Sequence, residues 1–172
     1  MCANVKLMRG IVDSLPFSLT VGTLGIVFGA TAGSAGLGNL TAILMSFLVF
    51  SGSAQFAALG LWKQHATALL LTTTLLSTRF LLMSASLAAR LPRIPTWLRT
   101  LLGFGVTDES YALSVTRGAK GAQISVPYLA GCMLAIYVPW VLGTGLGASL
   151  IRPLIKRAQI HRRSAERRLG DE

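Results

Sequence analysis

The sequence predicts an all-α polytopic membrane protein with about five transmembrane or re-entrant helices, some of them broken by glycine or proline. Of its 172 residues, 52% are hydrophobic and 13% are charged, whereas soluble domains carry about 25% charged residues. Apolar runs of about 20 residues recur, which is enough to cross roughly 30 Å of hydrocarbon. They fall at about 14–33, 40–62, 66–88, 98–116 and 125–150. We predict a membrane domain over 1–150 and a basic tail over 151–172.

The first segment, 14–33, carries glycine at every fourth position in its second half. Pro16 lies near its predicted helix start, where the missing N–H costs little. Gly25, Gly29 and Gly33 follow at strict four-residue spacing. A stripe without side chains lets another helix approach closely inside a membrane. We predict that these glycines pack against a second helix; the alternative is that they line a narrow path.

The second and third segments have clear ends. Segment 40–62 ends at Trp62 with Lys63 behind it, a combination that anchors a helix at the membrane surface. Segment 66–88 is followed by the basic turn ARLPRIPTW at 89–97. The two prolines of this turn prevent the helix from continuing.

The fourth segment, 98–116, is the weakest span, because the polar run TDESY interrupts it at 107–111. Either the helix breaks there, near Gly103 and Gly105, or the polar residues line a wet cavity. The fifth segment, 125–150, contains two prolines and the sequence GTGLGA, and the basic tail follows it.

The net charge of +10 does not indicate nucleic-acid binding. Seven of the 16 Lys and Arg lie in the last 21 residues, and most others flank apolar segments, which is typical of charges at a lipid bilayer surface. With five full spans, five cations share the side of the N-terminus and ten share the other. The positive-inside rule then predicts a cytoplasmic tail. The side of the N-terminus stays open, because a fourth segment that dipped in and returned would place both ends in the cytoplasm.

The sequence indicates neither a metal site nor an enzyme. Cys2 and Cys132 lie far apart, and His65 and His161 have no ligand-like spacing, so we expect no metal, no cofactor and no disulfide. A serine nucleophile would need a histidine base within reach, and both histidines lie outside the apolar segments. We therefore expect no enzymatic activity.

Arg79 lies about twelve residues into the third segment. An arginine at the centre of a membrane helix costs roughly 2.5–3.5 kcal/mol on insertion scales. Thr72, Arg79 and Ser86 recur at heptad spacing, so one polar face of this helix should point into the bundle. The alternative is that Arg79 extends its side chain to the membrane surface.

The adjacent acids Asp108 and Glu109 lie in the middle of the fourth segment. Two ionised carboxylates facing lipid would be very costly. We predict that one of them is the counter-charge of Arg79. The pair is then either a structural ion pair, or a group that binds a charged substrate or carries a coupling proton.

The second segment contains the polar stretch Ser51, Gly52, Ser53 and Gln55 inside an apolar run. Interhelical hydrogen bonds by Ser and Gln would account for it, at about 0.6 kcal/mol each. Gly52 between two serines favours instead a helix unwound at this point, as in the discontinuous helices from which transporters build sites at mid-membrane depth.

Four blocks in this order carry a family resemblance: PFSLTVGTLGIVFG, MSFLVFSGSAQFAALGLW, STRFLLMSASLAARL and VTDESYALS. Over residues 5–150 the chain resembles the AzlC-type branched-chain amino acid permease family. The resemblance implies a bacterial inner-membrane subunit that exports leucine, isoleucine, valine and similar amino acids, together with a small hydrophobic AzlD-type subunit. The polar blocks of the family fall here on the predicted substrate-binding residues Ser51, Gly52, Ser53, Gln55, Arg79, Thr107, Asp108 and Glu109.

The chain also departs from the family pattern. The family usually has Asn, His and Tyr around the arginine, where this chain has Ser77, Phe80 and Met83. The family continues with further apolar segments, where this chain has its charged tail, so we expect a short variant or a truncated copy. The alternative function is a structural or regulatory membrane subunit that does not transport.

Overall fold

The computed structural model describes residues 3–33, 35–49, 51–62 and 66–151, and every regular element in these ranges is helical. The predicted all-α fold is confirmed. The tail beyond Ile151 lies outside the described residues, so its predicted place stays a prediction. The helices are α1 (Ala3–Ala32), α2 (Asn39–Leu48), α3 (Gly52–Leu61), α4 (Ala66–Arg90), α5 (Thr96–Phe104), α6 (Asp108–Ala119) and α7 (Val126–Leu146), which a π-helical turn (Gly147–Ile151) extends.

Three of the described helices are long and apolar enough to cross a membrane: α1, α4 and α7 with its extension. The five predicted apolar segments are all helical, but the second and the fourth are each a pair of half-helices rather than one span. In addition, α1 begins at Ala3, so Pro16 lies inside the helix and not near its start as the sequence predicted.

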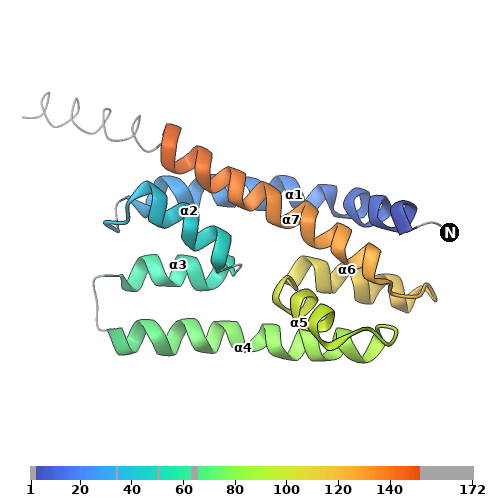
Figure 1. The fold of residues 1–172 in the computed structure, drawn as a ribbon. Helices are drawn as coiled ribbons and strands as arrows, with labels where there is room; N and C mark the ends of the chain where they lie inside the picture. Colours follow the sequence, from blue (N-terminus) through green and yellow to red (C-terminus); the bar gives the residue numbers. More distant parts are fainter. Residues whose placement is uncertain (1–2, 34, 50, 63–65, 152–172) are drawn as a thin grey trace, which may run out of the picture.

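The two pairs of half-helices form hairpins that enter the bundle and return (Figure 1). The α2 helix starts at the end where α1 finishes, reaches the middle of the bundle, and α3 runs back to the same end. After α4 has crossed in the other direction, α5 and α6 form a similar hairpin from the opposite end. The prediction of transmembrane or re-entrant segments therefore holds, with two of the five segments re-entrant. The charge count of five to ten, which assumed five full spans, does not apply.

The α1–α7 contact is the most extensive in the molecule. The two helices run parallel, because Gly10 lies against Tyr128 whereas Gly29, farther along α1, lies against Thr144, farther along α7. At Gly29, a Cβ would overlap the Thr144 carbonyl oxygen, so only glycine allows the backbones to approach this closely. Gly25 packs on α7 in the same way. Gly33 lies one residue beyond the end of α1, and its packing stays a prediction.

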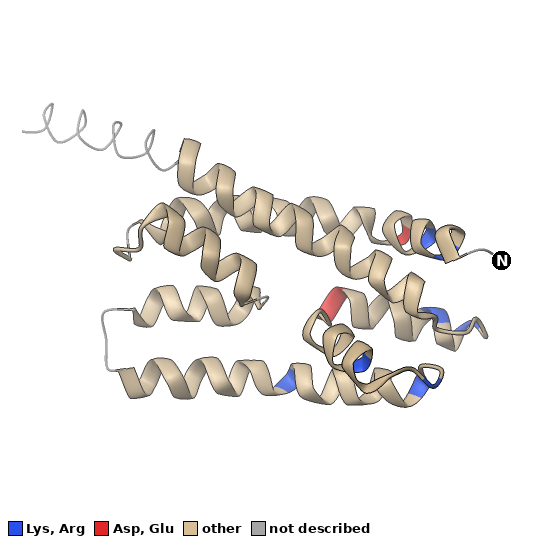
Figure 2. Cartoon of the chain, viewed as in Figure 1, with Lys and Arg blue, Asp and Glu red and all other residues tan. Residues whose placement is uncertain are grey.

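The surface cations of the described part gather at one end of the bundle (Figure 2). Apart from Arg79, every described Lys and Arg lies near the start of α1, the α4–α5 turn or the end of α6. The chain leaves the described part at Ile151, at the opposite end. With three spans, the cation-rich end and Ile151 lie on opposite sides of the membrane, so the positive-inside rule no longer decides the orientation of the described helices.

The re-entrant order can be tested by the sidedness of two exposed positions, Gly38 before α2 and Thr96 at the start of α5. In a background with Cys2→Ser and Cys132→Ser, we expect Gly38→Cys and Thr96→Cys to react with a membrane-impermeant maleimide from opposite sides. Spheroplasts label one of them, and the other reacts only after permeabilisation. Five full spans would place both on one side, so labelling from the same side would refute the hairpins.

The glycine contact predicts a difference between Gly29→Ala and Gly145→Ala. A Cβ at Gly29 overlaps the α7 backbone, whereas a Cβ at Gly145 meets nothing within 4 Å. Overpacking typically costs roughly 1–3 kcal/mol, so Gly29→Ala should clearly lower the thermal unfolding temperature in detergent. Gly145→Ala should leave that temperature unchanged or raise it, because alanine favours helix over glycine. Equal effects of the two substitutions would contradict the packing.

Candidate functional site

The break between α2 and α3 produces the first half of the site. The α2 helix ends at Leu48, and Ser51 has extended backbone (φ −145°, ψ 93°) before α3 begins at Gly52. A Cβ at Gly52 would lie 3.2 Å from the Trp140 ring, so glycine lets this half-helix start close against α7. The predicted break at Gly52 is confirmed.

The break between α5 and α6 produces the second half. The α5 helix ends at Phe104, and Thr107 caps α6 with a capping box: its Oγ1 accepts from the Ser110 N–H, and the Ser110 Oγ accepts from the Thr107 N–H. Asp108 and Glu109 occupy the first turn of α6, where negative charge is favoured by the helix dipole. The predicted helix break in this segment is confirmed.

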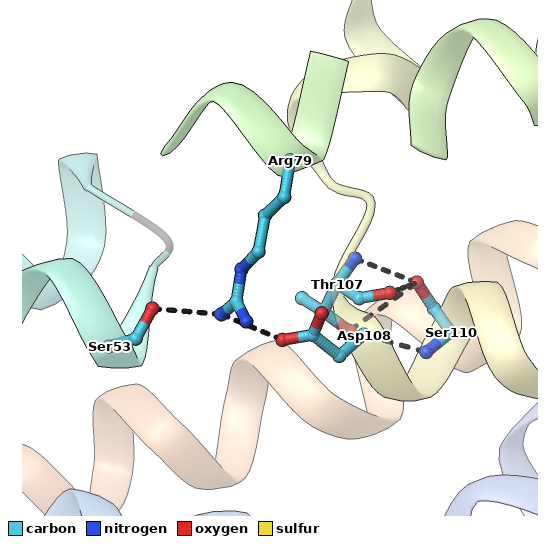
Figure 3. Close-up of polar contacts among 5 residues, drawn as sticks. All are labelled: Ser53, Arg79, Thr107, Asp108 and Ser110. Atoms are coloured by element: carbon cyan, nitrogen blue, oxygen red, sulfur yellow. Dashed lines mark hydrogen bonds and ion pairs between the residues drawn. The ribbon is translucent and has the colours of Figure 1, made fainter. Parts of the chain in front are cut away.

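Arg79, near the middle of α4, connects the two breaks (Figure 3). Its Nη2 donates to Ser53 Oγ on α3 at 2.8 Å and lies 2.8 Å from Asp108 Oδ2 on α6. The predicted acidic counter-charge is confirmed, and it is Asp108. Among the described residues Glu109 has no ion-pair partner, although it lines the same cavity.

A cavity of about 300 Å³ surrounds this contact. That volume is at the lower end for small-molecule pockets, about 300–1,000 Å³. Its polar lining includes Ser51, Ser53, Arg79, Asp108 and Glu109, and its apolar lining includes Val21, Leu24, Phe56, Ile136 and Trp140. A larger hollow of about 650 Å³ between α4 and α5 is mostly apolar and includes neither member of the Arg79–Asp108 pair.

The cavity combines charge with partial access. The Arg79 and Asp108 side chains are 41% and 43% exposed. A small molecule that enters the cavity can therefore contact both of them. The N-termini of α3 and α6 also adjoin the cavity and add partial positive charge. The arrangement offers a cation, two carboxylates, hydroxyls and an apolar wall within one small volume.

Seven of the eight predicted substrate-binding residues line this cavity, and Gln55 does not. Gln55 is fully buried, and its amide nitrogen donates to the Met45 carbonyl at 2.8 Å and to the Val49 carbonyl. It thereby connects the start of α3 to the end of α2. Gln55 lies in the first turn of α3 and bonds back to α2 and its C-cap, as the interhelical hydrogen-bond alternative expected. Substrate binding by the other seven stays a prediction.

Sequence reasoning missed the apolar wall of the cavity. Val21 and Leu24 come from α1, Phe56 from α3, and Trp140 from α7. No sequence signal distinguished these side chains from other apolar residues in the same helices. Only the meeting of α1, α3 and α7 in space shows which of them face Arg79.

A second charged contact lies nearer the cation-rich end. The Tyr128 hydroxyl donates to Asp13 Oδ2 at 2.9 Å, Arg117 Nη1 lies 3.6 Å from the same oxygen, and the Arg117 guanidinium lies 4.3 Å from the Tyr128 ring centre. This contact holds the last turn of α6 against α1 and α7. Sequence reasoning missed this contact; Asp13, an acid directly before the first apolar segment, is the signal that could have indicated it.

Comparison with known proteins identifies the family. Residues 16–154 match the family described as "AzlC protein". The chain belongs to the AzlC family. A protein of Archaeoglobus fulgidus named "Uncharacterized membrane protein" is 32% identical over 140 residues, covering 81% of this chain and 60% of the relative. "Inner membrane protein YgaZ" of Escherichia coli is 26% identical over 149 residues, covering 84% of this chain and 61% of that protein.

The chain thus spans about three fifths of the length of these AzlC-family relatives. Their names and the apolar helices identify it as a membrane protein. No solved structure matches it.

The two N-caps predict different costs of substitution. The Thr107 side chain makes a cap hydrogen bond, whereas the Ser51 side chain makes none to the start of α3. Replacing a bonded N-cap by alanine costs about 0.5–2 kcal/mol. We expect Thr107→Ala to lower the thermal unfolding temperature in detergent more than Ser51→Ala does; the reverse order would contradict the described capping.

Proposed function

We propose that this AzlC-family chain is a transport subunit that exports branched-chain or similar apolar amino acids across the inner membrane. The observation that carries the proposal is the Arg79–Asp108 pair, part-exposed in a small cavity where two broken helices meet. Ionisable residues at membrane depth commonly mark substrate pathways. Discontinuous helices commonly form the binding sites of secondary transporters.

The chemistry of an apolar amino acid matches the groups in the cavity. Its carboxylate needs a cation, which Arg79 supplies, with help from the N-terminus of α3. Its ammonium group needs an anion, which Asp108 or Glu109 supplies. Its side chain needs an apolar surface, which Leu24 and Phe56 provide. A bound zwitterion would replace the Arg79–Asp108 ion pair. Its carboxylate would pair with Arg79 and its ammonium group with Asp108, so neither protein charge would be left unpaired.

The proposal includes a small hydrophobic AzlD-type partner subunit, as the resemblance of the sequence implies. A protonatable Asp108 or Glu109 is consistent with exchange against protons. The rival function is a structural or regulatory membrane subunit, for which the ion pair would only hold α4 against α6. The two functions differ in whether the chain changes amino acid efflux.

The test uses Arg79→Leu and Asp108→Asn, with Arg93→Leu as the control. Arg93 is an exposed cation in the α4–α5 turn, outside the cavity. Cells loaded with leucine-containing dipeptides, expressing the chain with its AzlD-type partner, should export leucine. Each cavity variant removes a charge that would contact the substrate, so we expect it to reduce efflux at least about tenfold, a loss of roughly 1.4 kcal/mol. The control should export like wild type.

The amount of protein in the membrane is measured in the same cells. If both cavity variants accumulate normally and export at the wild-type rate, the proposed site is wrong. If the wild-type chain exports no amino acid with or without the partner, the structural-subunit function replaces the transport function.

A further inference from the structure

The order of the described helices repeats once along the chain. A long helix followed by a hairpin of two half-helices occurs as α1, α2 and α3, and again as α4, α5 and α6. The half-helices before the breaks have 10 and 9 residues, and those after the breaks have 10 and 12. The breaks, 49–51 and 105–107, are equally long. The two series therefore match in the order of their elements, and their half-helices match closely in length.

The two series run in opposite directions through the bundle (Figure 1). The hairpin of α2 and α3 enters from one end, and the hairpin of α5 and α6 enters from the other. Ser51 and Thr107, the N-caps of α3 and α6, occupy equivalent places, and both have extended backbone, with φ of −145° and −120°. Units related in this way form an inverted-topology repeat, and transporters with such repeats bind their substrate where the units meet.

The two units bring different chemistry to their junction. Arg79, Asp108 and Glu109 all belong to the second unit, and the first unit contributes no charged side chain to the cavity. Thr23 lies as far before the N-cap Ser51 as Arg79 lies before the N-cap Thr107, so Thr23 is the position equivalent to Arg79. In this stretch of α1, the side chains that line the cavity are Val21 and Leu24. The second unit thus offers the charged side chains, and the first unit offers the apolar side chains of α1 and α3 together with the polar N-terminus of α3.

We propose that residues 3–61 and 66–119 form an inverted repeat in which the first unit binds the substrate's side chain and the second unit binds its charged groups. Leu24 is then a specificity-determining residue, because it lines the cavity from the first unit. The proposal rests on the proposed function, since it takes the substrate to be an amino acid. It goes beyond that function by assigning the side-chain subsite to α1 and α3.

Leu24 suits an experiment because its side chain is 45% exposed. Shortening it should enlarge the cavity without removing a core contact. Leu19, on the same helix, is 78% exposed and does not line the cavity. Leu19→Ala is therefore a matched control for Leu24→Ala. Leu24→Phe provides a change of opposite sign, because it fills part of the cavity.

The experiment measures how alanine and phenylalanine compete with labelled leucine for efflux by the full chain with its partner. A few carbons in an apolar pocket change discrimination by about tenfold or more. We expect Leu24→Ala to improve competition by phenylalanine relative to alanine by about tenfold. Leu24→Phe should shift the ratio by a similar factor in the opposite direction, and Leu19→Ala should keep the wild-type ratio.

The outcomes separate this inference from the function on which it rests. If wild type exports leucine and the phenylalanine-to-alanine ratio is the same in all four proteins, the side-chain subsite is not on α1, while the proposed function stands. If Leu19→Ala shifts the ratio as much as Leu24→Ala does, the effect is not local and the assignment also fails. If wild type exports no amino acid, both proposals are overturned.

Discussion

The positive charge of Arg79 is the constraint on which the arrangement of the described helices depends. A guanidinium this far along a membrane helix needs anionic and hydrogen-bonding partners at the same depth. Discontinuous helices place polar side chains at this depth. The chain brings two breaks to Arg79, one supplying Ser53 and the other Asp108. The hairpins are therefore the structural means of placing polar groups at mid-depth without a polar helix crossing the membrane.

The breaks stay in place because the parallel α1–α7 pair forms a rigid support behind them. Glycines on both helices, including Gly29 and Gly143, let the backbones meet. Between nearly apolar helices, such close approach gains van der Waals contact that bulkier residues would prevent. Trp140, on the same α7, packs on Gly52 at the start of α3. The backbone contact and the cavity wall thus depend on the same two helices.

The sequence was informative wherever a residue type conflicts with its surroundings. Arg79, Asp108 and Gly52 stood out because charge or flexibility is costly in an apolar helix, and each lies at the cavity. The sequence could not predict whether a broken segment continues across the membrane or turns back, since apolar content and length are similar in both cases. The apolar lining of the cavity could not be predicted either, because Leu24 and Leu19 differ only in what faces them across the bundle.

The two hairpins differ in how the polar groups at their tips are hydrogen-bonded. At the α5–α6 tip, Thr107 and Ser110 satisfy each other, and the Asp13–Arg117 contact secures the base of the hairpin. At the α2–α3 tip, Ser51 Oγ, Gln55 Oε1 and the neighbouring Trp140 Nε1 are buried without a hydrogen-bond partner among the described residues. Buried unpaired polar atoms cost about 1–3 kcal/mol each. The α2–α3 tip is thus held by the Gln55 amide nitrogen on the Met45 and Val49 carbonyls and by the packing of Trp140 on Gly52, rather than by a capping box.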